Sequence, residues 1–237
     1  MAPQVFGIEH ILYIIFSTAF GAAVLILIRK YAKTEKAQSI SLKCFAFFLL
    51  AAILANRLAK VFSDEQVRWY CIIPDSYCGM TSLVLALAVL FGKKNNCLLH
   101  FSWLLALFGG ISTVIYPAFI SYNSSFFHLA TISGLLHHSL SAILSIALLL
   151  LGRIDITYKK WHYVILGFTC YLTVGAFLMS VFKVSDAFHI VEPLLSDTNL
   201  TTWVMAPMYI VGHGAIFAII ELVRYKKAKN EQPTAKE

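Results

Sequence analysis

Seven long apolar segments, separated by short polar connections, occupy most of the chain. Each is about 17–25 residues long, the length that a helix needs to cross the hydrocarbon core of a bilayer. None has the alternation of period two of a barrel strand, and in lipid a helix satisfies its own backbone hydrogen bonds. The pattern predicts an all-α, polytopic membrane protein with seven transmembrane helices at Ile8–Ile28, Ser41–Phe62, Val67–Phe91, Leu98–Ile115, Phe126–Leu151, His162–Phe182 and Thr201–Leu222.

The composition supports a membrane protein and excludes a soluble one. Hydrophobic residues make up 59% of the chain and charged residues 13%, against about 45–50% and about 25% in ordinary globular proteins. The formal net charge of +7 lies mostly in the connections between apolar segments, so it does not indicate a nucleic-acid partner. The five cysteines form no Cys-x-x-Cys pair and no zinc spacing. We therefore expect no metal and no cofactor.

The basic residues are distributed unevenly among the connections. The first, third and fifth connections and the C-terminal tail hold 15 of the 19 lysines and arginines. Because cytoplasmic loops carry the excess of Lys and Arg, we predict that the N-terminus lies outside and the C-terminus in the cytoplasm. Residues 1–223 are predicted to form one seven-helix transmembrane domain, and residues 224–237 a basic, mobile cytoplasmic tail. We expect a multi-pass protein of a bacterial plasma membrane, and its oligomeric state stays open.

Polar residues in the fifth span form one candidate site. An ionisable side chain inside a membrane span is costly, so it indicates either function or a hydrogen bond between helices. Small and polar residues recur here at helical spacing in one stripe centred on His138, while His137 points about 100° away. Close packing of neighbouring helices is the other interpretation of this stripe, which consists of Thr131, Gly134, His138, Ser141 and Ser145.

The third span carries a similar polar face, formed by Cys71, Asp75, Cys78 and Ser82 at spacings of four, three and four. Cys78 is expected about 16 Å into this span, and His138 at a similar depth in the fifth. A thiol becomes a nucleophile when a neighbouring base removes its proton, and a neutral imidazole can act as that base. We therefore predict Cys78 and His138 as a catalytic pair. In the alternative interpretation, Cys78 is a small hydrophobic residue of the core.

Five further residues are candidates for substrate binding. Tyr209 and His213 are one turn apart in the seventh span, where His213 can orient a substrate carbonyl. Arg57 lies near the outer headgroup level, and a guanidinium suits bidentate phosphate binding. His10 in the first span and Asp75 in the third complete the set. Structural roles are the alternatives: a Tyr–His hydrogen bond between helices, snorkelling of Arg57 to the interface, and packing of His10.

Four short segments occur in the order and spacing of the motifs of a known family: Phe6-Gly7-Ile8-Glu9-His10, Pro74-Asp75-Ser76-Tyr77-Cys78, Leu136-His137-His138-Ser139-Leu140 and Pro207-Met208-Tyr209. On these segments the chain resembles the YwaF-type integral membrane proteins. That family includes the animal transmembrane-protein-164 acyltransferase and is distantly similar to androgen-induced and androgen-dependent membrane lipid hydrolases. The chain departs from the pattern at Ser76, where bacterial relatives have histidine, and around Ser185-Asp186-Ala187-Phe188, where the Asn-Tyr pair of the family is not recognisable.

The resemblance implies a cysteine nucleophile and a histidine base, here Cys78 and His138, and an acyl-enzyme thioester resolved by a lysophospholipid or by water. We therefore predict a membrane-embedded acyltransferase or lipid hydrolase acting on a phospholipid or another acyl-lipid ester, with membrane lipids as its partners. A small permease or solute-binding component is the alternative, although seven spans do not divide into two equal repeats. Haem ligation by His138 and His213 is a third hypothesis, whereas the absence of a lysine from Pro207–Leu222 disfavours a retinal protein.

Overall fold

A computed structural model of the chain describes residues 5–62, 67–117, 120, 125–195 and 197–231. This part of the chain contains helices and no strands, which confirms the predicted all-α class. The elements are α1 (Ile8–Tyr31), α2 (Glu35–Val61), η1 (Trp69–Ile72), α3 (Tyr77–Phe91), α4 (Cys97–Ile115), α5 (Leu129–Leu150), η2 (Tyr158–Lys160), α6 (His162–Val181) and α7 (Thr202–Glu231). Among them, six α-helices are long and apolar enough to cross a membrane, and α3 is shorter.

The chain divides into two compact units. Met1–Ile154 contains α1 to α5 with η1, and Asp155–Glu237 contains η2, α6 and α7. The predicted division at residue 223 and the predicted orientation in the membrane stay predictions.

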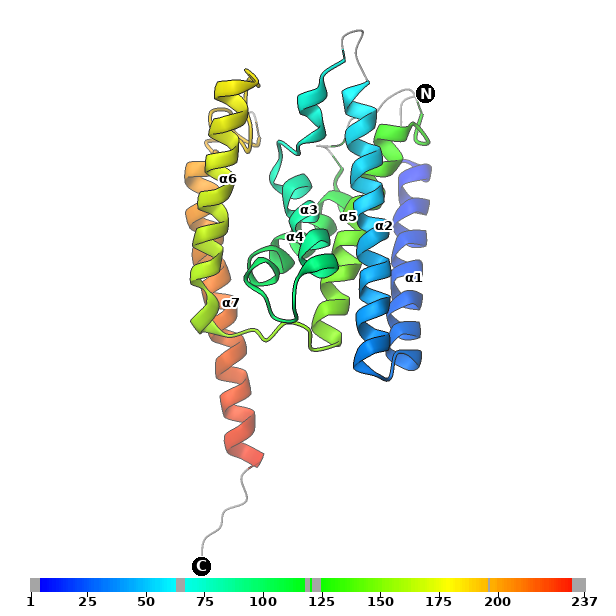
Figure 1. The fold of residues 1–237 in the computed structure, drawn as a ribbon, viewed down its shortest axis with the longest axis vertical. Coiled ribbons are helices and arrows are strands. Elements are labelled where there is room, and N and C mark those ends of the chain that lie inside the picture. The colour runs from blue at the N-terminus through cyan, green and yellow to red at the C-terminus, as the bar shows by residue number, and fades with distance from the viewer. Residues whose placement is uncertain (1–4, 63–66, 118–119, 121–124, 196, 232–237) are drawn as a thin grey trace, which may run out of the picture. The chain divides into compact units, whose positions relative to one another are not determined.

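In the first unit, α5 is the central helix. It packs against α1, α2, α3 and α4 and is buried along most of its length (Figure 1). In contrast, α1 leaves large apolar side chains on its outer face, with Ile8 78% and Phe16 73% exposed. Exposed apolar faces of this kind are unfavourable in water and are typical of helices that contact lipid. The contrast places α5 in the protein interior and α1 toward lipid.

The predicted third span, Val67–Phe91, is too long. The helix α3 begins at Tyr77 and has 15 residues, about 22 Å at 1.5 Å per residue, against about 30 Å of bilayer hydrocarbon. Proline has no N–H and disfavours helical geometry in the residue before it, so Pro74 prevents a helix from continuing through Ile73. In the described residues 67–73, just before this proline, the chain forms the 3₁₀ helix η1 at Trp69–Ile72.

The second unit is held together by contacts between α7 and the segment that precedes α6. The indole Nε1 of Trp161 donates to the carbonyl oxygen of Ile210 at 2.8 Å. Arg224 Nη1 donates to Asp155 Oδ1 at 3.3 Å and to the carbonyl oxygen of Ile156 at 2.9 Å. The helix α7 continues to Glu231, beyond the predicted end at Leu222, and residues 232–237 of the predicted tail lie outside the described residues.

Candidate active site

Cys78 is the second residue of α3 and lies in its first turn. Ser76 is the N-cap of this helix, and its Oγ accepts a hydrogen bond from the N–H of Gly79 at 3.3 Å. The N–H groups of a first turn lack partners within the helix and form the positive end of its dipole, so they favour negative charge. Ser76, which departs from the family pattern, therefore has a defined structural role beside the predicted nucleophile. Because α3 begins at Tyr77, the prediction that Cys78 lies about 16 Å along a helix from Val67 is wrong.

The thiol of Cys78 lies against α4. Its Sγ lies 3.0 Å from the position that a Cβ on Gly109 would occupy. The thiol is also hydrogen-bonded with the side chain of Thr113, one turn further along α4. Thr113 is buried, whereas Cys78 is partly exposed. The sulfur thus lies against α4 beside the hydroxyl of Thr113.

His138 approaches the same stretch of α4 from α5. Its backbone oxygen lies 2.6 Å from the position that a Cβ on Gly110 would occupy. The side chain of His138 is 7% exposed, and its buried Nδ1 has no hydrogen-bond partner. Ser141, from the predicted stripe, donates to the backbone oxygen of His138 at 2.9 Å. An unpaired buried polar atom of this kind is costly and needs a functional or structural reason.

Two adjacent glycines of α4 thus connect the predicted catalytic residues. Gly109 faces the Cys78 thiol on α3, and Gly110 faces the His138 backbone on α5. Small residues allow membrane helices to approach closely, so the glycine pair lets α3 and α5 pack closely at the same level of α4, on faces about 100° apart. Neither glycine, nor Thr113, is among the candidates predicted from the sequence. The adjacent glycines, Gly109-Gly110, were the available signal.

His137 belongs to the same buried region, although the predicted stripe excludes it. Its ring centroid lies 4.1 Å from that of His138, with an angle of 34° between the ring planes. His137 is 5% exposed, its Nδ1 bonds the backbone oxygen of Ser133 at 3.2 Å, and its buried Nε2 has no partner. Since a carbonyl oxygen only accepts, Nδ1 carries the proton and Nε2 presents a lone pair. Two imidazoles, each with one unpaired ring nitrogen, therefore lie in contact.

Arg57 is buried beside the first turn of α3. Its Nη1 donates to Asp75 Oδ1 at 3.1 Å, and the two side chains are 4% and 43% exposed. Its Nη2 lies 3.2 Å from the position that a Cβ on Gly79 would occupy, and its buried Nε has no hydrogen-bond partner. Arg57 therefore does not snorkel to an interface. It places a fixed positive charge next to the helical turn that carries Cys78.

Cys71 is not on the helix face that the spacing predicted. It lies in η1, and Asp75 lies in the loop before α3, so only Cys78 and Ser82 of the predicted face share a helix. Burial raises the pKa of the Cys71 thiol, while the nearby guanidinium of Arg68 acts in the opposite direction. Among the described residues, no group of three or more His, Cys, Asp and Glu side chains is arranged to hold a metal ion.

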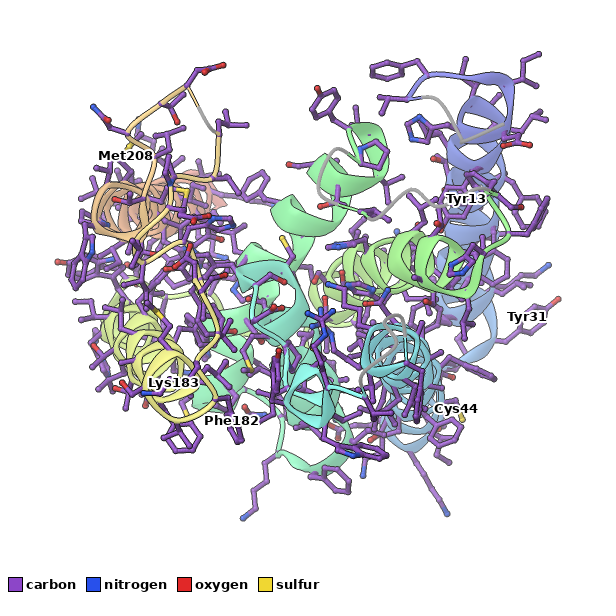
Figure 2. All side chains as sticks on the ribbon, turned by 90° about the horizontal axis from the view of Figure 1, so that it is seen from above. Tyr13, Tyr31, Cys44, Phe182, Lys183 and Met208 are labelled. Carbon is purple, nitrogen blue, oxygen red and sulfur yellow. The ribbon has the colours of Figure 1, made fainter. Side chains whose placement is uncertain are left out.

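The other cysteines lie on the surface of their units. Cys44, Cys97 and Cys170 are exposed, and all five cysteines are free thiols. Figure 2 shows Cys44 at the periphery of the first unit.

His10 connects the start of α1 to the end of α4. Its Nδ1 accepts from the N–H of Phe6 at 3.0 Å, and its Nε2 bonds the backbone oxygen of Val114 at 2.9 Å. Because Nδ1 accepts, the proton lies on Nε2, which donates to the carbonyl. Both ring nitrogens of this fully buried side chain are therefore engaged by backbone groups.

Tyr209 and His213 belong to the second unit. Their ring centroids are 4.9 Å apart, and Phe168 and Phe217 extend the cluster, with centroids 5.6 Å from Tyr209 and 5.2 Å from His213. His213 is 1% exposed. The two candidates thus lie together, as their spacing predicted, within an aromatic cluster of α6 and α7.

Comparison with known protein families identifies the chain. The model of the TMEM164 family matches residues 5–225. The chain therefore belongs to the TMEM164 family, which confirms the resemblance predicted from its short motifs. No curated protein and no solved structure matches the chain. With its long apolar helices, the chain is a multi-pass membrane protein of this family.

Proposed function

We propose that this member of the TMEM164 family is a membrane-embedded acyltransferase or lipid hydrolase that acts on a phospholipid or another acyl-lipid ester. Cys78 is the nucleophile and His138 the base. The observation that carries the proposal is the position of the two residues on adjacent glycines of α4, with the thiol at Gly109 and the His138 backbone at Gly110. Nucleophilic catalysis by cysteine needs a base near the thiol, and in this proposal the imidazole of His138 is that base.

In the first step, the Cys78 sulfur attacks the carbonyl carbon of the ester while His138 accepts the thiol proton. The resulting tetrahedral intermediate breaks its carbon–oxygen bond, and the imidazolium of His138 gives the proton to the departing alcohol, a lysolipid. In the second step, the hydroxyl of an acceptor lipid, or water, attacks the thioester carbonyl and transfers its proton to His138. The thioester carbon–sulfur bond then breaks, and the proton returns to the sulfur.

Two groups near the thiol can stabilise negative charge during these steps. Cys78 lies in the first turn of α3, at the positive end of the helix dipole, and the guanidinium of Arg57 lies against the same turn. Fixed donors aimed at a developing oxyanion are often the largest contribution to acyl-transfer catalysis. In this proposal, Arg57 stabilises the oxyanion or a lipid phosphate, and Asp75 holds Arg57 in place.

The remaining candidates have separate roles in the proposal. Tyr209 and His213 belong to the second unit, and their role in substrate binding stays a prediction. His10 has a structural role, because backbone groups occupy both of its ring nitrogens. We further propose a plasma membrane as the location of the protein, which fractionation of cells that express the chain will test.

A turnover assay tests the proposal. The full chain is reconstituted in vesicles that contain a phospholipid with a labelled acyl chain, and release or transfer of the label is followed. Cys78→Ala and His138→Gln abolish turnover, whereas Cys71→Ala, which removes a thiol outside α3, retains it. Turnover by Cys78→Ala at the unsubstituted rate rejects the assignment. Protein-dependent solute uptake that is unaffected by Cys78→Ala supports the permease alternative.

A further inference from the structure

A pocket lies at the end of α3 remote from Cys78. It is a small surface pocket of about 20 Å³, and its lining includes the cationic residues Lys93, Lys94 and Arg153 with Gly92 and Ser39. Gly92 follows Cys78 by 14 residues, so the pocket is about 21 Å away from the thiol along the helix. All of these residues belong to the first unit. The pocket is therefore a separate site with its own chemistry.

The charges at this pocket fit an oxyanion. A single carboxylate oxygen, Glu35 Oε1, lies 3.2 Å from Arg153 Nη1 and 3.8 Å from Lys94 Nζ. Glu35 is the only acidic side chain that bridges these described cations, and it is 74% exposed, whereas the side chain of Arg153 is 15% exposed. The exposed carboxylate of Glu35 therefore binds the more buried guanidinium of Arg153 at a position where an oxyanion of a ligand can bind instead. With three cations and one carboxylate, the pocket keeps a surplus of two positive charges.

The backbone that presents these cations is fixed by hydrogen bonds. The N–H of Asn95 donates to the backbone oxygen of Arg153 at 3.1 Å, which joins the loop before α4 to the end of α5. The amide of Asn96 donates to the backbone oxygen of Lys93 at 2.7 Å, while its Oδ1 caps α4 through the N–H of Leu99 at 3.0 Å. The lysine side chains thus project from an ordered loop, and a preorganised site loses less entropy on binding.

Exposed apolar side chains occur next to lining residues of the pocket in the sequence. Ile40, Phe91 and Leu98 each adjoin a lining residue in the sequence, and they are 53%, 81% and 47% exposed. A site for a soluble anion has no need of an apolar rim. A lipid presents both parts, a phosphate for the cations and acyl chains for the apolar side chains. Basic pockets between the ends of membrane helices are a recognised form of lipid headgroup site.

We propose that this pocket binds the phosphate of an anionic lipid headgroup, with a phosphomonoester such as that of phosphatidic acid as the best fit. Arg153 and Lys94 contact the phosphate oxygens, and Glu35 is displaced when the lipid binds. Lys93 adds long-range attraction. The predicted orientation places this face in the cytoplasm, where anionic lipids are enriched. The site is independent of Cys78 chemistry, so each can fail without the other.

The test measures lipid binding to the purified full chain by native mass spectrometry and by the shift of Tm. The probes are phosphatidic acid, phosphatidylcholine and inorganic phosphate. Phosphatidic acid binds and raises the Tm of the unsubstituted chain. Lys94→Gln with Arg153→Gln weakens this binding by roughly 25-fold, at about fivefold for each basic side chain. Lys33→Gln is the matched control, because it removes one positive charge from an exposed loop outside the pocket, and it leaves binding unchanged.

Glu35→Gln provides a second test with the opposite sign. This substitution replaces the competing carboxylate by a neutral amide of nearly the same size. The affinity for phosphatidic acid therefore rises severalfold. Three results would overturn the proposal: equal binding of phosphatidylcholine and phosphatidic acid, unchanged binding by the Lys94 and Arg153 variant, or weaker binding by Glu35→Gln. Stabilisation by inorganic phosphate equal to that by phosphatidic acid overturns the lipid assignment in favour of a soluble phosphate.

Discussion

The two glycines at the candidate site predict different consequences for the same substitution. In Gly109→Ala, the new Cβ lies 3.0 Å from Cys78 Sγ, the end of a short side chain. In Gly110→Ala, it lies 2.6 Å from the backbone oxygen of His138, with Ala142 Cβ and Ser141 Oγ both at 3.0 Å. A side chain can shift more easily than a helix backbone. We therefore expect Gly109→Ala to impair chemistry and Gly110→Ala to impair stability.

The magnitudes follow from these contacts. Replacing glycine by alanine within a helix gains up to about 1 kcal/mol from helix propensity. Overpacking against fixed atoms costs about 1–3 kcal/mol, so Gly110→Ala lowers the free energy of unfolding by roughly 1–2 kcal/mol net. For Gly109→Ala, the cost of shifting the Cys78 sulfur offsets much of the gain in helix propensity. The free energy of unfolding therefore stays within about 0.5 kcal/mol of that of the unsubstituted chain. A displaced nucleophile slows acyl transfer by on the order of tenfold or more.

The assay combines unfolding of the detergent-solubilised chain with lipid turnover. Gly212→Ala is the matched control, because nothing lies within 4 Å of the position of its Cβ. It reports helix propensity alone and keeps turnover. Equal turnover by Gly109→Ala and Gly212→Ala would refute the placement of the thiol against α4. A Gly110→Ala variant as stable as the Gly212→Ala control would refute the close approach of α4 and α5.

Three further predictions concern the surroundings of Cys78. Asp75→Asn leaves the buried guanidinium of Arg57 without its anion and lowers the free energy of unfolding by about 1–2 kcal/mol. In a double-mutant cycle, the variant that combines Arg57→Met with Asp75→Asn recovers part of this loss. Ser76→Ala removes the N-cap of α3 and costs about 1 kcal/mol, and Ser76→Thr retains most of it; equal stability of the two variants contradicts the capping role. Because burial raises the pKa of Cys71, less thiolate is present near neutral pH, so its alkylation is slower than that of exposed Cys97, which precedes the predicted fourth span, and increases toward higher pH. Equal rates at every pH would contradict this prediction.

The apolar pattern predicts the helices well where a long segment has no internal stop signal. The predicted α4, at Leu98–Ile115, differs from the observed Cys97–Ile115 by one residue. The apolar pattern predicts the wrong helix start at Val67–Phe91, because one proline hardly changes the mean hydropathy of a long apolar segment. Pro74 and the capping side chain of Ser76 are local signals, and together they move the start of the helix to Tyr77. The same shift moves Cys78 from the middle of a helix to its first turn.

The candidate site is predictable only in part, because its contacts join helices remote in the sequence. Helical spacing selects His138 but excludes His137, since a wheel predicts one inward face and α5 is buried on most sides. From its position in the sequence, near the end of an apolar segment, Arg57 is predicted to be a cation at the membrane interface. Its burial depends on Asp75, 18 residues later, and that pairing follows only from the packing of α2 against the loop before α3. Such pairings are properties of the tertiary structure.

The central claim is that acyl transfer proceeds through a thioester on Cys78. The most direct measurement is peptide mass spectrometry of the full chain, quenched in acid during turnover of a phospholipid. The account predicts the mass of one acyl chain on the peptide that contains Cys78, removed by hydroxylamine and absent from Cys78→Ala. Lipid turnover with the acyl chain on a different residue, or with no acylated peptide at any time, would contradict it.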